Sequence, residues 1–143
     1  MSDISENSII KIFSDGGARG NPGPGAAAFV VIVDGDVYYE ERKYLGVVTN
    51  NIAEYTAILM ATEWLKNNKA SINAKIIHYF VDSLLAANQL LGVYKIRDKG
   101  LLEIFLKIKK IQNSLPFKIA FQHIPREKNK YADCLVNVAI DEN

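Results

Sequence analysis

The sequence has a single cysteine, Cys134, and it has no apolar run of the ~18–20 residues that a membrane-spanning helix needs. One cysteine excludes a disulfide within the chain, so the fold depends on its core and suits a reducing compartment, which predicts a cytoplasmic location. Residues 1–8 are polar and lack the basic start and apolar stretch of a secretory signal peptide. We therefore expect no association with a membrane.

The chain also has little net charge, +1 over 143 residues, but its charges are unevenly distributed. Residues 1–94 carry 7 basic and 10 acidic side chains, whereas residues 95–130 carry 10 basic and 3 acidic side chains. A basic segment within a neutral protein favours a polyanionic partner, although a solvated, lysine-rich helix face would have the same composition. With 49% hydrophobic residues, the chain has the composition of one globular domain.

Alternating apolar and turn-forming segments predict an α/β fold, with a five-stranded mixed sheet flanked by helices. The expected strands cover residues 8–14, 26–33, 37–44, 74–81 and 117–123. The first three form an antiparallel meander, with a loop rich in glycine and proline over residues 16–25. The expected helices cover residues 50–67, 83–91, 99–113 and 130–141. We expect a flexible N-terminus over residues 1–8 and one domain over residues 9–141.

Four acidic residues stand at the ends of these expected elements. Asp15 ends the first strand, Glu54 lies in the first turn of the first long helix, Asp82 ends the fourth strand, and Asp133 lies near the start of the last helix. Ligands of open α/β sheets gather beyond strand ends and helix starts. Four converging carboxylates would repel one another unless a cation lay among them, and oxygen ligands of this kind select Mg²⁺ or Mn²⁺. Taken singly, each acid also has an ordinary explanation as a turn former, a helix cap or a partner of the helix dipole.

The segments around these acids resemble the motifs of type 1 ribonuclease H. The opening motif of that family is similar to residues 15–25, Asp-Gly-Gly-Ala-Arg-Gly-Asn-Pro-Gly-Pro-Gly, and its Thr-Asn-Asn-x-x-Glu segment is similar to residues 49–54. Asp82-Ser83 matches the family's Asp-Ser pair, and His123 and Asp133 match its His and Asp ten residues apart. The resemblance covers residues 9–139 and implies a ribonuclease H-like fold with a catalytic domain over residues 9–141.

The resemblance also implies an activity. Members of the family are endoribonucleases that hydrolyse the RNA strand of RNA–DNA hybrids with two metal ions, leaving 3′-hydroxyl and 5′-phosphate ends. By this resemblance Asp15 bridges two Mg²⁺ ions, and Asp133 helps to hold the ion that activates water. Glu54 and Asp82 help to hold the ion on the leaving side, and Mn²⁺ is the expected substitute metal. His123 assists proton movement or product departure.

Recognition of a hybrid requires contact with the 2′-hydroxyl, which only RNA carries. By the same resemblance, the backbone of Gly16, Gly17 and Ala18 and the side chain of Glu54 contact these hydroxyls. The side chains expected along the minor groove or near a DNA phosphate are those of Asn21, Thr49, Asn50 and Asn51. Helix capping is the alternative explanation for Asn50 and Asn51. An RNA–RNA duplex is a further candidate substrate, and we expect a monomer.

Two features depart from the family pattern. Leu84 stands where many members place a glutamine that contacts the minor groove, so one hydrogen bond to the substrate is expected to be missing. The segment between Leu91 and Asp98 is too short for the basic protrusion with which some bacterial members grip the duplex. Six basic residues between Lys95 and Lys110 are expected to replace it in part. With only about eight residues before the first strand and no separate hybrid-binding domain expected there, we predict weak, non-processive binding.

Three other interpretations stay open at this point. The first is a catalytically silent duplex-binding module of the same fold, against which the intact acids argue. The second is a related nuclease or polynucleotidyl transferase, but such enzymes need further regions for which 143 residues leave no room. The third is a metal- or phosphate-binding protein built on the glycine loop, which lacks the Gly-Lys-Ser/Thr ending of a nucleotide-binding P-loop.

Overall fold

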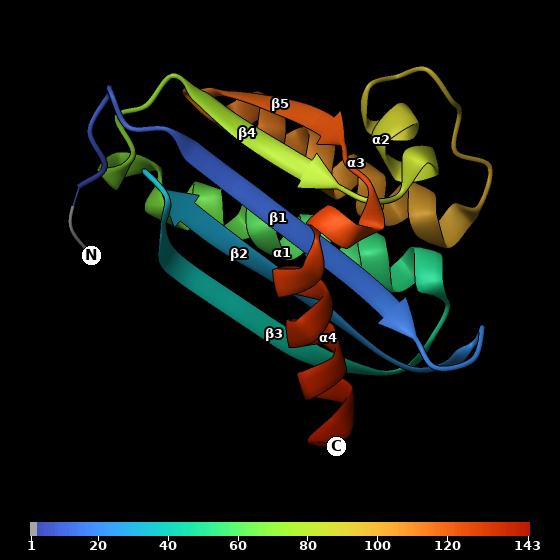
Figure 1. The fold of residues 1–143 in the computed structure, drawn as a ribbon. Helices are drawn as coiled ribbons and strands as arrows, with labels where there is room; N and C mark the ends of the chain where they lie inside the picture. The colour runs from blue at the N-terminus through green and yellow to red at the C-terminus, as the bar shows by residue number, and fades with distance from the viewer. Residues whose placement is uncertain (1–2) are drawn as a thin grey trace.

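The computed structural model describes residues 3–143, and its centre is a five-stranded mixed sheet in the order β3-β2-β1-β4-β5 (Figure 1). The strands are β1 (Ile10–Ala18), β2 (Gly23–Val33), β3 (Asp36–Val48), β4 (Ile76–Val81) and β5 (Lys118–His123). β1, β2 and β3 are antiparallel neighbours, whereas β4 and β5 run parallel to β1. The predicted class, a five-stranded mixed sheet whose first three strands are antiparallel, is confirmed.

Helices cover both faces of this sheet (Figure 1). The helices are α1 (Asn50–Asn68), α2 (Leu84–Leu90), α3 (Lys99–Ser114) and α4 (Lys130–Asp141), with short 3-10 helices at Lys69–Ser71 and Arg126–Lys128. α1 packs on β1 and lies beside α3, while α4 packs on the other face against β1, β2 and β3. The main core lies under α1 and α3 and includes the fully buried side chains of Tyr55, Ile58 and Tyr79. The core under α4 is smaller, because β2 contributes only the methyl groups of Ala26 and Ala28 there.

The hairpin between β2 and β3 forms where the sequence places it. Asp34 and Gly35 both have positive φ angles, 51° and 88°, which is the backbone of a tight two-residue hairpin turn. Glycine adopts this conformation without steric cost, and aspartate tolerates it better than most residues do. The Asp34 carboxylate also accepts a hydrogen bond from the backbone N–H of Ile9, at 2.9 Å, which links this turn to the start of β1.

The glycine-rich segment is mostly strand, so the loop predicted over residues 16–25 is wrong at both ends. β1 continues to Ala18 and β2 begins at Gly23, which leaves residues 19–22 as the connection. Residues 16–18 pair with residues 25–27 in regular antiparallel register. The glycines here therefore belong to strands, and at Gly16 the start of α1 occupies the space that a side chain would fill. As a consequence Asp15 lies within β1 and not at its end.

The N-terminal segment contacts the domain through Ile4. This side chain is only 3% exposed, and its backbone exchanges hydrogen bonds with Ser71 and Asn73 at 2.7 and 3.0 Å. The sequence did not indicate this contact, and flexibility over residues 1–8 stays a prediction, with residues 1 and 2 outside the described part of the chain. Among residues 3–143, no helix combines the length and the apolar character needed to cross a membrane.

Candidate active site

Asp15, Glu54 and Asp82 converge at one edge of the sheet. β1 and β4 are parallel neighbours, and Phe13 lies opposite Phe80. Asp15 and Asp82 each come two residues after this pair, so both reach the same edge of the sheet. Each of the three acids offers a carboxylate oxygen, and these three atoms lie within 4.8 Å of one another. Asp15 and Glu54 are buried, at 2% and 9% exposure, and Asp82 is half-buried. Three separate segments of the chain thus form one acidic cluster, defined here as Asp15, Glu54 and Asp82.

Gly16 allows Glu54 to reach this cluster. A Cβ atom at Gly16 would lie 2.2 Å from the backbone carbon and oxygen of Ala53 and 2.4 Å from the backbone nitrogen of Glu54. The start of α1 therefore rests directly on the backbone of β1, as only glycine permits. Glu54 is the fifth residue of α1 and lies just beyond its first turn, so its predicted place within that turn is wrong.

Alanine at Gly16 is expected to lower the melting temperature by roughly 5–10 °C, because the overlap must push α1 away from β1 at a cost of about 1–3 kcal/mol. Gly17→Ala is the matched control. A Cβ atom at Gly17 meets no other atom within 4 Å, so this variant is expected to melt within about 2 °C of the wild type. Thermal unfolding followed by circular dichroism tests the pair, and equal melting temperatures would contradict the close approach.

The connection after β1 is held to the start of α1 by asparagine side chains. The Asn50 Oδ1 atom accepts a hydrogen bond from the Ala18 N–H at 2.8 Å, and the Asn21 Oδ1 atom accepts one from the Asn50 N–H at 3.0 Å. The cap of α1 is Thr49, whose Oγ1 accepts from the Ile52 N–H at 3.2 Å. The suggested capping role of Asn50 and Asn51 is therefore wrong. Asn51 instead lines a hollow of about 310 Å³ together with Asn21 and Thr49.

The acidic cluster has strongly shifted protonation equilibria. Burial, with the negative charges of Asp82 and Glu54, raises the pKa of Asp15 from 3.8 to about 8, and a side-chain hydrogen bond with Asp133 adds to the rise. Burial and the charge of Asp82 raise the pKa of Glu54 from 4.5 to about 7, against the opposing effects of Ser83 and Arg126. Without a cation, the cluster therefore retains protons at neutral pH.

Asp133 and His123 approach the cluster from two further elements. Asp133 lies in the first turn of α4 and shares a side-chain hydrogen bond with Asp15, although it is outside the group of three within 4.8 Å. His123 is the last residue of β5 and pairs with Val81, the residue before Asp82. Its side chain is exposed at the same edge of the sheet. The structure thus brings all four predicted acids and the predicted histidine to one edge.

Two residues at this edge were not indicated by the sequence. Asn129 is 1% exposed, and its Nδ2 atom donates to the Asp82 Oδ2 atom and to the Ser14 carbonyl oxygen, both at 2.9 Å. Arg126 lines the hollow of about 260 Å³ that contains Asp15, Glu54 and Asp82. Both residues lie between the strand expected over residues 117–123 and the helix expected over residues 130–141, and only their position shortly before Asp133 could have drawn attention to them.

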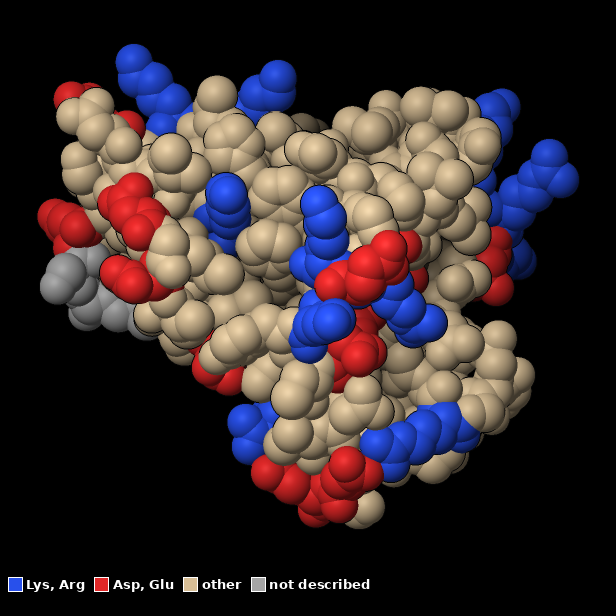
Figure 2. All heavy atoms as spheres, in the orientation of Figure 1, with Lys and Arg blue, Asp and Glu red and all other residues tan. Residues whose placement is uncertain are grey.

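The surface view shows how charge is arranged around this edge. In Figure 2, Asp and Glu side chains gather near the start of α4 and are bordered by Lys and Arg side chains. Arg126 and Lys128 come just before that helix, and Lys130 is its first residue. A negative centre with a positive border fits a cation in the centre and a polyanion across it.

The sheet order and the acidic cluster together define a protein of the ribonuclease H-like class. The family model described as "Reverse transcriptase-like" matches residues 13–139. LC11-RNase H1, crystallised in complex with an RNA/DNA hybrid, has a TM-score of 0.87 at 42% sequence identity, covering 93% of this chain and 97% of that chain. RNase H1 from the archaeon Halobacterium salinarum has a TM-score of 0.85 at 31% identity, covering 94% and 98%. The chain belongs to the type 1 ribonuclease H family.

Curated relatives agree with this assignment over part of their length. The bifunctional protein Rv2228c of Mycobacterium tuberculosis is 32% identical over 134 residues, covering 92% of this chain and 35% of that protein. Ribonuclease HI of Halobacterium salinarum is also 32% identical over 134 residues, covering 93% and 65%. The chain therefore spans about a third of the mycobacterial protein and about two thirds of the halobacterial one.

Proposed function

We propose that the chain is a metal-dependent endonuclease that hydrolyses the RNA strand of RNA–DNA hybrids. The observation that carries this proposal is the acidic cluster, three carboxylates within 4.8 Å of one another at a sheet edge that also receives Asp133 and His123. The hybrid bound by LC11-RNase H1, at 42% identity to this chain, supports the choice of substrate. A catalytically silent binding module has no need of buried acids held in mutual repulsion.

The donor set fits hard divalent cations. All three ligand atoms are carboxylate oxygens, which Mg²⁺ and Mn²⁺ prefer. Asp15, Glu54 and Asp82 would hold one ion, and Asp15 with Asp133 would help to hold a second. Bound there, two ions would supply the charge that stabilises the attacking and leaving oxygens of an in-line displacement. We propose Mg²⁺ as the natural metal, with Mn²⁺ as a substitute.

The chain's own groups prepare this site for the reaction. Asp15 and Glu54 would release their retained protons in the field of a bound cation, because positive charge favours the ionised carboxyl groups. Asn129 holds the Asp82 carboxylate in place through the hydrogen bond from its Nδ2 atom. Arg126 offers a guanidinium group to the scissile phosphate. His123, exposed at the end of β5, is placed to carry a proton to or from solvent.

The segment around Gly16 is proposed to contact the RNA strand. Gly16, Gly17 and Ala18 form the end of β1 beside the acidic cluster, and at Gly17, where a Cβ atom would meet nothing within 4 Å, the missing side chain allows a close approach of the RNA 2′-hydroxyls to the backbone. The Asn50 side chain uses its Oδ1 atom within the protein, which leaves its Nδ2 atom to donate to a base or sugar. Asn21, Thr49 and Asn51 line the adjacent hollow, which we assign to the minor-groove side of the duplex.

Incubation with labelled duplexes tests the proposal directly. With Mg²⁺ or Mn²⁺, an RNA–DNA hybrid is expected to be cut to 3′-hydroxyl and 5′-phosphate ends, whereas DNA–DNA is expected to resist. A hybrid with 2′-O-methyl groups around the scissile phosphate is the matched control and should also resist. Binding of hybrid without cleavage would identify the silent module instead. An RNA–RNA duplex is a further candidate substrate, which the same assay tests. A monomeric state and a cytoplasmic location are further predictions.

A further inference from the structure

The segment between α2 and α3, residues 91–98, is exposed and basic. It has no helix or strand, and all of its residues except Ile96 are exposed (Figure 1). Lys95 and Arg97 lie in this segment, and Lys99 follows as the first residue of α3. In the part of the chain that the structure describes, no carboxylate forms an ion pair of 4.0 Å or less with these three side chains. We call residues 91–98 the arm.

A chain of buried polar groups holds the arm to α1. Tyr55, which follows Glu54 on α1 and is 2% exposed, donates its hydroxyl hydrogen to the Oε1 atom of Gln89 on α2. Gln89 is 6% exposed, and its Nε2 atom donates to the backbone carbonyl oxygen of Lys95 at 3.4 Å. The Gln89 amide therefore binds α1 with its oxygen and the arm with its nitrogen. Because a buried polar group is costly when it is unpaired, these bonds hold all three partners in place.

The two ends of the arm are fixed by other contacts. The backbone N–H groups of Val93 and Tyr94 donate to a carbonyl oxygen in the last turn of α2, at 2.8 and 3.2 Å. Ile96 is half-buried against the main core, and Asp98 is the N-cap of α3. Between these ends, the side chain of Gln89 attaches the middle of the arm.

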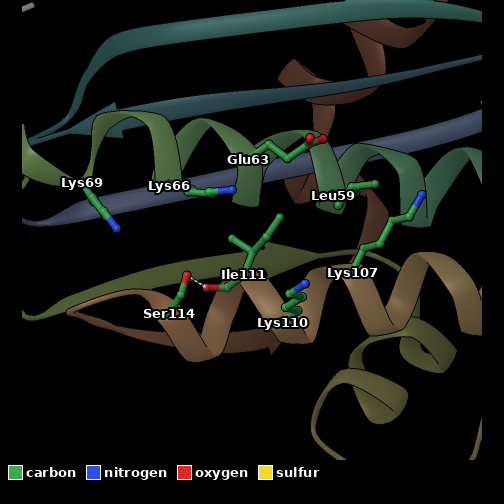
Figure 3. A pocket seen from close by; sticks show the side chains of 8 residues that line it. All are labelled: Leu59, Glu63, Lys66, Lys69, Lys107, Lys110, Ile111 and Ser114. Atoms are coloured by element: carbon green, nitrogen blue, oxygen red, sulfur yellow. Dashed lines mark hydrogen bonds between the residues drawn. The ribbon is translucent and has the colours of Figure 1, made fainter.

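The end of the arm reaches the surface that we assign to the hybrid. Asp98 lines the same hollow of about 310 Å³ as Thr49, on the proposed minor-groove side. α3 begins close to α1 there, since a Cβ atom at Gly100 would lie 3.6 Å from the Cδ1 atom of Ile52. Farther along, the two helices stay side by side, with Ile111 extending from α3 toward α1 (Figure 3). The cations of the arm therefore flank the proposed substrate surface.

We infer that Tyr55 and Gln89 are positioning residues for the hybrid, because they hold the arm where its cations can bind phosphates of the duplex. Cations on a fixed backbone lose less conformational freedom on binding than cations on a mobile loop, so a fixed arm binds the duplex more tightly. Tyr55 is buried and acts through the arm without contacting the substrate itself. This role rests on the proposed function, since the ligand of the arm is the proposed substrate.

Tyr55→Phe tests this role, because it removes the hydroxyl and keeps the ring. The variant is expected to bind a labelled RNA–DNA hybrid at least about fivefold more weakly, measured by fluorescence anisotropy in EDTA, since Gln89 loses its partner and the arm is released. With Mg²⁺ its KM should rise by a similar factor, while kcat stays within about twofold of the wild type. Tyr39→Phe is the matched control. The Tyr39 hydroxyl donates to the Oε1 atom of Glu41 at 2.6 Å on β3, so the same group and the same kind of bond are lost there, and affinity should stay within about twofold.

Removal of the cations shows whether Tyr55 acts through the arm. Lys95→Ala with Arg97→Ala is expected to weaken binding at least about tenfold at about 0.1 M salt and to lower the slope of log Kd against log salt concentration by about 2. Tyr55→Phe added to this double variant should weaken binding by less than about twofold more, because the arm then has no cations to place. Gln89→Met, which keeps the length of the side chain, should have the same effect on affinity as Tyr55→Phe alone.

Three results would overturn this role. The first is an affinity of Tyr55→Phe within about twofold of the wild type. The second is the same loss of affinity from Tyr55→Phe with and without the cations of the arm, because Tyr55 would then act through the core. The third is a lower kcat with an unchanged KM, which would place the effect at Glu54. Failure of the wild type to bind hybrid would refute the proposed function as well, whereas binding without cleavage would refute the hydrolysis alone, because anisotropy in EDTA still measures the arm.

Discussion

Replacing Asp15 by asparagine is expected to lower the rate of hybrid cleavage by at least about a thousandfold, while affinity for the hybrid in the absence of cleavage changes by less than about threefold. Asparagine keeps the shape of the side chain but removes the charge that lies between Glu54, Asp82 and Asp133. A cation held by the remaining acids would be bound more weakly and in a different place. Initial rates on a labelled hybrid at saturating Mg²⁺, with filter binding in EDTA, measure both quantities.

Two further variants make this result specific. Asp36→Asn removes one carboxylate from an exposed position at the start of β3, and it should cleave at the wild-type rate. His123→Ala should retain measurable turnover, because bound metal would carry most of the electrostatic stabilisation. Activity of Asp15→Asn within tenfold of the wild type would refute the role assigned to Asp15. Complete loss in His123→Ala would instead make His123 a ligand or a structural element.

The layered fold could be predicted because most of its strands and helices are determined by local sequence patterns. The turn at Asp34 and Gly35, the apolar strands and the helix that follows Thr49 all follow from spacing and turn chemistry. The strand structure within residues 16–25 could not be predicted, because glycine and proline usually indicate a loop. Here the missing side chain at Gly16 serves the packing of α1 on β1, a contact between residues 37 or more positions apart in the chain.

At the candidate site, the sequence predicted the four acids and His123 but not the residues that hold the acids in place. Asp15, Glu54, Asp82 and Asp133 lie in motifs that resemble a known family, so their convergence followed from the resemblance and the sheet topology. No motif indicated Asn129. The sequence does not show whether a loop asparagine is exposed or, like Asn129, buried and hydrogen-bonded to an acid such as Asp82. Long-range contacts of this kind depend on the packed fold and not on local propensity.

The metal-free wild type is expected to melt at a lower temperature at pH 8 than at pH 5.5. The pKa values of Asp15 and Glu54 in the folded protein, about 8 and about 7, lie above their ordinary values of 3.8 and 4.5. At a pH between the ordinary and the folded-state pKa values, the folded protein holds protons that the unfolded chain has released. The free energy of unfolding is therefore highest at low pH, and it falls as the pH rises through the folded-state pKa values. Asp15→Asn removes the larger of the two effects and should raise the stability in EDTA at pH 8 by on the order of 1–3 kcal/mol.

Added Mg²⁺ should reverse this order of stability. A ligand that binds only the folded state adds RT ln(1 + [L]/Kd), about 2.7 kcal/mol at a hundred times Kd, and the wild type is expected to bind the cation more tightly than Asp15→Asn does. Thermal scans at pH 5.5 and pH 8, with EDTA or with increasing Mg²⁺, should therefore show the wild-type melting temperature rising toward that of the variant and then past it. Asp36→Asn should follow the wild type at every condition, since its carboxylate is exposed and distant from the acidic cluster. If Asp15→Asn melts below the wild type in EDTA at pH 8, then Asp15 stabilises the fold through its hydrogen bonds, and the repulsion within the cluster is too weak to matter.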